Sequence, residues 1–168
     1  MMRISRSLLC LVAMVALGMG CDHRDHRDSV EKDFPTTKPM DSELVGTYDV
    51  TDYPSSVYTP TGRSTLTLNG DNSFTMVEMP GWEYPGPNGV LRTLSRGQLI
   101  SGTGTWGVAQ RQDRDVTFYG LNLDFEKLGA RQVNIVVMNI DLREKGAHYQ
   151  ILLPTDPDGY GFIVLEMK

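Results

Sequence analysis

From Leu44 onward, short segments with strand character are separated by turn signals, and this pattern limits the fold more than any other feature of the chain. Residues 63–68 alternate between polar and apolar side chains, which is the two-residue period of a half-buried β-strand. The sequence NGDN at residues 69–72 follows directly and is typical of a hairpin turn, because Gly and Asn tolerate positive φ. The pattern predicts an all-β body.

The same reasoning predicts about eight to ten antiparallel strands with regular turns, which is typical of a barrel or a sandwich. Residues 133–142 are apolar on both faces and are expected in the middle of a sheet, because an exposed strand of this kind promotes aggregation. The best candidate helix, residues 124–132, is short and is interrupted by Gly129, so we expect no amphipathic helix. The expected strands cover residues 44–50, 63–68, 74–79, 90–94, 97–100, 103–109, 116–121, 132–142, 148–153 and 161–167.

Three segments carry a family resemblance: LVGTYDV at residues 44–50, STLTLNGDNSFTM at 64–76 and GTGTWGV at 102–108. Their order and spacing resemble the small bacterial lipocalin-like, or calycin-like, barrel domains, in which a Trp usually stands where this chain has Tyr48. The resemblance implies a barrel that binds a small apolar ligand, with Tyr48 and Trp106 as candidate binding residues. On physical grounds these two aromatic side chains would plug one end of the barrel.

The first 20 residues have the features of an export signal. Arg3 and Arg6 precede ten mostly apolar residues, 8–17, which would form a helix only about 15 Å long, roughly half a bilayer core. The segment before Cys21 resembles the lipobox of bacterial lipoproteins, with Leu17 one position earlier than usual. This resemblance implies cleavage of the signal peptide, attachment of diacylglycerol (with acyl chains such as palmitate) to Cys21, and a membrane-tethered body facing the periplasm.

An ordinary secretory signal is the alternative, and it would leave Cys21 as a free thiol. The expected organisation is a signal peptide at 1–20, a flexible tether at 21–41 and an all-β domain at 42–168. The tether contains two HRD triplets, at 23–25 and 26–28, whose His and Asp side chains could in principle gather around a metal ion. We interpret it instead as a solvated spacer, because a metal site generally needs ligands held by a folded frame.

The net charge of the chain is −5, and removal of Arg3 and Arg6 would leave 14 basic and 21 acidic residues, a net charge of −7. An acidic domain is repelled by phosphate backbones, so we expect no nucleic-acid partner. No motif points to a cofactor or to catalysis. His148 is the sole histidine of the expected domain and is interpreted as a structural or surface residue, and the sequence DPDG at 156–159 as a turn rather than a Ca²⁺ loop.

Residues 80–89, with three prolines and three glycines, are expected to form a loop that presents Trp82 and Tyr84. These aromatic side chains either anchor a partner or fold back onto the core of the domain.

Three hypotheses remain for the function. The first is a non-enzymatic lipoprotein of the cell envelope that holds a small apolar ligand in its barrel. The second is a protein-binding inhibitor or immunity protein, and the third is a structural or assembly lipoprotein.

Overall fold

The computed structural model describes residues 33–53, 64–85, 91–113, 115–155 and 161–168, with only the backbone at 82–85, 91–98, 113 and 139. These ranges contain one short helix and eight strands. The elements are α2 (Asp41–Leu44), β1 (Gly46–Asp52), β2 (Thr65–Leu68), β3 (Ser73–Pro85), β4 (Leu91–Asp113), β5 (Val116–Leu128), β6 (Arg131–Lys145), β7 (His148–Pro154) and β8 (Phe162–Met167).

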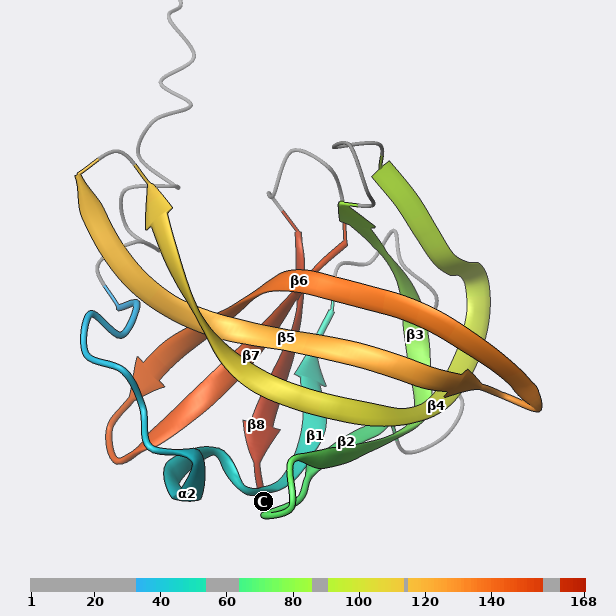
Figure 1. Cartoon of the computed structure of the whole chain (residues 1–168), viewed down its shortest axis with the longest axis horizontal. Coiled ribbons are helices and arrows are strands. Elements are labelled where there is room, and N and C mark those ends of the chain that lie inside the picture. Colours follow the sequence, from blue (N-terminus) through green and yellow to red (C-terminus); the bar gives the residue numbers. More distant parts are fainter. Residues whose placement is uncertain (1–32, 54–63, 86–90, 114, 156–160) are drawn as a thin grey trace, which may run out of the picture.

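The eight strands form a closed barrel in which every strand pairs antiparallel with its neighbour in the sequence (Figure 1). The barrel closes between β1 and β8, where Tyr48 lies opposite Met167. The expectation of an all-β antiparallel barrel is therefore confirmed. Among the described residues, no helix is both long and apolar enough to cross a membrane.

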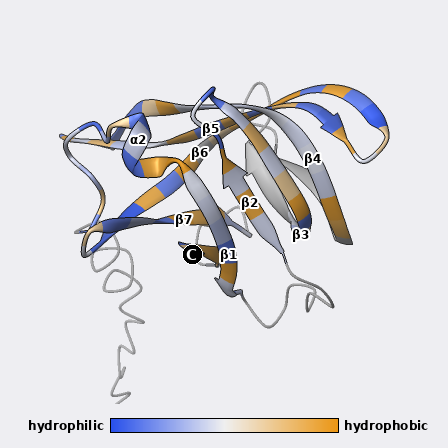
Figure 2. Cartoon of the chain, turned by 90° about the horizontal axis from the view of Figure 1, so that it is seen from below, coloured by the Kyte–Doolittle hydropathy of each residue, from blue (hydrophilic) through white to orange (hydrophobic). Residues whose placement is uncertain are grey.

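Two ends of the barrel follow from the up-and-down topology. The β2–β3, β4–β5 and β6–β7 turns lie at one end together with α2, and we call this the α2 end. The β1–β2, β3–β4, β5–β6 and β7–β8 connections lie at the other, which we call the loop end. Buried and exposed residues alternate along the strands, and Figure 2 shows hydrophobic and hydrophilic positions interleaved along β3, β4 and β5.

Several strands, among them β3, β5 and β6, are longer than the sequence pattern predicts, whereas β2 and β8 are shorter. Residues 90–94, 97–100 and 103–109 were expected as three strands, whereas β4 runs without interruption from Leu91 to Asp113. Gly102 lies between two of the expected strands but does not end β4, and a Cβ atom on it would lie 2.8 Å from the carbonyl oxygen of Lys127. A Cβ atom on Gly104, which was expected within a strand, would lie 1.9 Å from the carbonyl oxygen of Asp124. Glycine inside a strand marks such a close approach of another backbone.

The expectation of a loop over residues 80–89 is wrong for its first part, because residues 80–85 form the end of β3 and pair with β4. Proline is tolerated there because Pro80 lies at a shift in the β3–β4 register and Pro85 is the last residue of the strand. The segment 124–132, considered above as a helix, instead contains the end of β5, a turn at Gly129 with φ of 57° and the start of β6.

Candidate binding site in the barrel

The interior of the described barrel is apolar. Its central cluster consists of side chains with relative exposures of 0–7%, contributed by α2 and all eight strands. The buried polar residues in the described part of the chain are Ser64 and Gln150. Ser64 donates its hydroxyl to the carbonyl of Glu78, and Gln150 donates its amide to the carboxylate of Glu166. A ligand inside the barrel would therefore meet hydrocarbon and aromatic surface rather than charge.

The α2 end of the barrel is plugged by Tyr48 and Trp106. The Tyr48 hydroxyl donates to the carbonyl oxygen of Leu44 at 2.7 Å, which links β1 to the helix that precedes it. The Trp106 indole N–H donates to the carbonyl oxygen of Asn69 at 3.0 Å, in the β2–β3 turn. Both aromatic rings are buried, and each polar atom has a partner, so this end is a closed, satisfied cap.

The middle of the interior is filled by an aromatic pair. The Phe74 and Phe125 rings meet edge to face, with centroids 4.9 Å apart and planes inclined by 82°. Met76 and Leu123 lie beside them in the same cluster and are almost completely buried. Side chains therefore fill this part of the interior.

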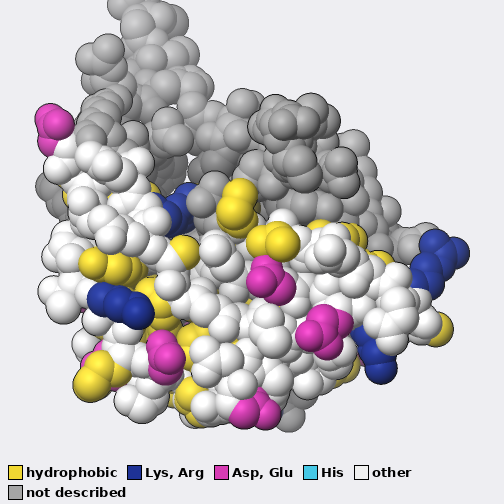
Figure 3. Space-filling model, in the orientation of Figure 1, with side chains coloured by type: hydrophobic (Ala, Val, Ile, Leu, Met, Phe, Trp, Pro, Cys, Tyr) yellow, Lys and Arg dark blue, Asp and Glu magenta, His cyan; other side chains and the backbone are white. Residues whose placement is uncertain are grey.

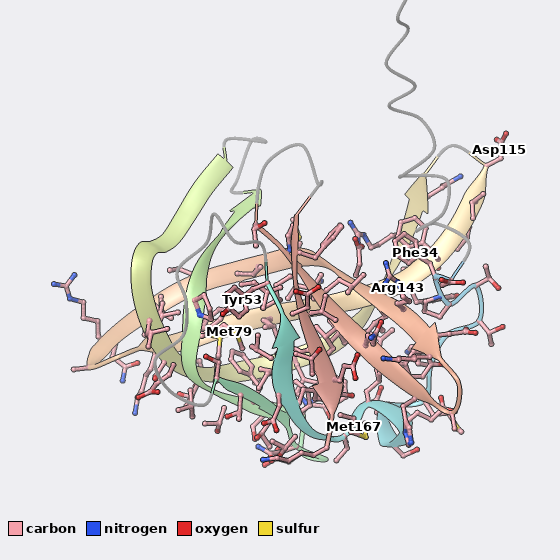
Figure 4. The ribbon with its side chains drawn as sticks, turned by 180° about the vertical axis from the view of Figure 1, so that it is seen from behind. Phe34, Tyr53, Met79, Asp115, Arg143 and Met167 are labelled. Atoms are coloured by element: carbon pink, nitrogen blue, oxygen red, sulfur yellow. The ribbon has the colours of Figure 1, made fainter. Side chains whose placement is uncertain are left out.

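Towards the loop end, some apolar side chains are only half-buried, whereas Met79, Leu153 and Ile163 are fully buried. Tyr53, Val133 and Ile135 pack against the central cluster but keep part of their surface exposed. Figure 4 shows Tyr53 and Met79 in this half of the barrel, on the same side as the ends of β1 and β3. We take Tyr53, Val133 and Ile135, which a molecule could reach from solvent, as the candidate entrance of an apolar binding site.

The barrel wall is incomplete next to this entrance. β6 pairs with β5 from Arg131 to Asp141, but its pairing with β7 begins only at Asp141. Within the described residues, no strand pairs with the other edge of β6 over residues 131–140. Residues 133–142 were expected in the middle of a sheet. Most of them instead lie in the part of β6 that, among the described strands, pairs with β5 alone. Two register shifts against β5 interrupt this edge, and shifts of this kind discourage strand addition.

A short N-terminal segment fills a second gap, between β5 and β6. This segment, which we call the strap, consists of Asp33, Phe34 and Pro35. The carbonyl of Asp33 accepts from the Glu144 amide at 2.8 Å, and that of Pro35 accepts from the Tyr119 amide at 3.0 Å. The strap lies within the segment expected as a flexible tether and is held at both strands.

Arg111 supports the strap from behind. Its guanidinium lies 5.1 Å from the centre of the Phe118 ring and forms an ion pair with Asp141. Phe118 in turn stacks on Phe34, and Figure 4 shows Phe34 close to Arg143. The Nε atom of Arg143 is buried without a hydrogen-bond partner. The strap therefore covers a polar, partly buried part of the wall rather than apolar surface alone.

The structure places the predicted site residues as follows. Tyr48 and Trp106 both lie buried at the α2 end, where each donates a hydrogen bond to a backbone carbonyl, and their role in ligand binding stays a prediction. Trp82 and Tyr84 lie in β3, where their backbones pair with those of Leu94 and Arg92, and their side chains lie outside the described part of the structure. Cys21, both HRD triplets and residues 156–159 also lie outside the described residues.

Burial raises the pKa of Tyr48, because it disfavours the charged phenolate. His148 is exposed at the start of β7. Within the described ranges, no group of three or more His, Cys, Asp or Glu side chains could hold a metal ion. Figure 3 shows acidic side chains spread over the face of the barrel in view.

Sequence reasoning missed the strap, the half-buried entrance and the unpaired edge of β6. One signal for the strap was present: Phe34 is the sole aromatic residue between residues 22 and 41, a segment that is otherwise mostly charged or polar.

Comparisons of the chain with protein-family models, curated proteins and solved structures found no match.

Proposed function

We propose that this chain is a non-enzymatic lipoprotein of the bacterial cell envelope, and that its barrel binds a small apolar ligand beside the loop end. The observation that carries this proposal is the apolar interior, which is capped by Tyr48 and Trp106 at one end and lined by half-buried Val133 and Ile135 towards the other. Burying apolar surface contributes about 25 cal/mol per Å², so a small hydrocarbon-rich molecule gains affinity without any charged contact.

The tethering part of the proposal rests on the export signal and Cys21. Two or more acyl chains anchor a protein stably, whereas one binds only marginally. Mass spectrometry of the mature N-terminus tests this part by itself. A diacylglycerol thioether on Cys21 is the expected result, and an unmodified thiol or another N-terminal residue would contradict it.

The ligand-binding part is tested with a fluorescent apolar probe that brightens when it leaves water. Ile135→Lys places a charge at the entrance, since Ile135 packs against the core. Val136→Lys is the matched control, because Val136 is the next residue on the same strand and is 43% exposed. We expect probe binding to fall at least tenfold for Ile135→Lys and to stay unchanged for Val136→Lys.

Ile135→Ala separates the effect of the added charge from that of the lost side chain, because it shortens the side chain without adding a charge. All three variants are compared with the wild type by urea unfolding. Equal probe affinity of the wild type and a folded Ile135→Lys variant would rule out the barrel interior as the binding site.

A protein-binding role is the second candidate, and the outer surface of β6 favours it. Val136 and Met138 are 43% and 46% exposed on β6, and no other described strand pairs with the second edge of β6 over residues 131–140. Pull-down from an envelope extract with the double variant Val136→Lys, Met138→Lys tests this role. A partner captured by the wild type and by Ile135→Lys, but lost with the double variant, would support it, and identical recovery by all three would exclude this surface.

A further inference from the structure

A hollow of about 200 Å³ lies on the outer wall of the barrel, away from the interior described above. The hollow is shallow and open, and it is lined by β3, β4, the end of β5 and the turn that follows β5. The side chains around it come mainly from outward-facing positions, and three of them carry hydroxyl groups. The residues that matter here are Thr75, Val77, Ser101, Thr103, Lys127 and Gly129.

Irregular strand pairing creates the hollow on an otherwise convex wall. The register of β3 against β4 shifts between Met76 and Met79, and that of β4 against β5 shifts at Thr103. Such bulges bend a strand and change the direction of its side chains. The wall is therefore depressed where the two shifts adjoin.

The backbone at the first register shift is strained at Glu78, and hydrogen bonds hold both the carbonyl and the amide of this residue. Glu78 has φ of 47°, a conformation that costs a residue other than glycine roughly 1 kcal/mol or more. The Ser64 hydroxyl donates to the Glu78 carbonyl at 2.5 Å, and the Glu78 amide donates to the Ser101 hydroxyl oxygen at 3.0 Å. Because Ser101 accepts this bond, its own hydroxyl hydrogen is available to the hollow.

The polar groups around the hollow form a row across three strands. Thr75 lies opposite Thr103, and Thr103 lies opposite Lys127, so their outward side chains are about 5 Å apart from strand to strand. All three residues are exposed. Among the described residues, Lys127 forms no ion pair. The hollow thus combines hydroxyl groups, one ammonium group and the apolar side chain of Val77, which is 40% exposed.

We propose that this hollow binds one neutral pyranose unit of a glycan. Hydroxyl groups both donate and accept, so Thr75, Ser101 and Thr103 match the hydroxyls of a sugar ring. Lys127 can donate to a ligand oxygen, while Val77 contacts the apolar face of the ring. A polyanionic glycan fits less well, because the net charge of the chain is −5. This inference does not depend on the binding of an apolar ligand in the barrel.

The test uses the full chain in a zwitterionic detergent that carries no sugar, with chitotetraose as the probe. Its acetamido carbonyl can accept from Lys127, and its methyl group can contact Val77. Transfer of NMR saturation from the protein to the sugar is expected, together with saturable, millimolar binding. The variants Thr75→Val and Thr103→Val should each weaken binding about fivefold, which corresponds to one hydrogen bond.

Thr105→Val is the matched control, because Thr105 is exposed on the same strand and lies outside the lining of the hollow. It should bind chitotetraose like the wild type. Valine preserves the branched shape that strands favour, so folding of the variants is expected and is checked by thermal unfolding. Absence of saturation transfer, equal weakening by Thr105→Val, or acetate binding as tightly as the sugar would each overturn the proposal. The last result would reveal a simple anion site at Lys127.

Discussion

Phe34 stacks on Phe118, with the two ring centroids 5.2 Å apart and the ring planes inclined by 27°. This contact joins the N-terminal strap to the outer wall of the barrel at the point where β5 and β6 separate. The carbonyls of Asp33 and Pro35 accept hydrogen bonds from the Glu144 and Tyr119 amides. These two amides lie where β5 and β6 do not pair with each other. The expected tether thus ends in a segment that completes the wall.

Replacing Phe34 by Ala should lower the free energy of unfolding by about 1–2 kcal/mol, because an aromatic pair and its buried area are lost. Urea unfolding measures this change. Hydrogen exchange at the Tyr119 and Glu144 amides should accelerate at the same time, since the strap holds both. Thr36→Ala, at an exposed position beside the strap, should change neither quantity. Unchanged exchange at both amides in Phe34→Ala would show that the ring does not hold the strap.

Replacing Gly104 by Ala should destabilise the barrel by about 3 kcal/mol or more, because the new Cβ would lie 1.9 Å from the Asp124 carbonyl oxygen. The neighbouring variant Gly107→Ala is the control, since nothing lies within 4 Å of a Cβ there. It should stay within about 0.5 kcal/mol of the wild type. Urea unfolding of both variants separates the two cases, and equal stabilities would contradict the packing at Gly104.

Stability should fall at high pH through Tyr48. Burial raises the pKa of its phenol, so the folded state keeps the proton while the unfolded chain releases it near pH 10. The contribution is therefore complete below about pH 10 and is lost as the pH rises further. Tyr48→Phe should show a shallower loss of unfolding free energy above pH 10. A decline as steep as that of the wild type would mean that Tyr48 does not cause it.

Tyr149→Phe is a useful comparison for this experiment. The pKa of Tyr149 is also raised, chiefly by desolvation and secondarily by the nearby Glu43 and Glu144 carboxylates. Tyr149 is less buried than Tyr48, so its removal should alter the pH dependence less.

Replacing Trp106 by Phe should cost about 1–3 kcal/mol, because the bond to the Asn69 carbonyl is lost and the smaller ring leaves a void. Thermal unfolding measures the change. Because the plug lies at the opposite end from the proposed entrance, probe binding should persist in folded protein. A loss of probe binding without a loss of stability would place the ligand at the α2 end instead.

The sequence predicted the features that local chemistry determines. The NGDN segment forms the β2–β3 turn, with Asn72 at φ of 64°, and Tyr48 and Trp106 plug one end of the barrel. Alternation and turn residues act over a few positions, which is why they can be recognised without a structure. The continuous β4 was missed partly because Gly102 lies between two of the expected strands, and its close approach to the Lys127 carbonyl becomes apparent only when the partner strand is known.

The entrance and the outer hollow could not be predicted in this way. Residues 133–142 are apolar on both faces, so periodicity cannot distinguish inward Ile135 from outward Val136. Two register shifts of β6 against β5 determine which side chains of β6 point inward, and these shifts depend on contacts with another strand. The hollow likewise arises from shifts in β3 and β4 and has no local signal.

The pairing of β1 with β8 has a consequence for the timing of folding. Tyr48 lies opposite Met167, and the amide of Lys168 donates to the carbonyl of Thr47 at 2.9 Å. Synthesis proceeds from the N-terminus, so β1 cannot pair with β8 until β8 has been made. Closure that joins such distant parts of a chain is intrinsically slow. Until then, the edge of β1 remains open to chaperones and to other chains.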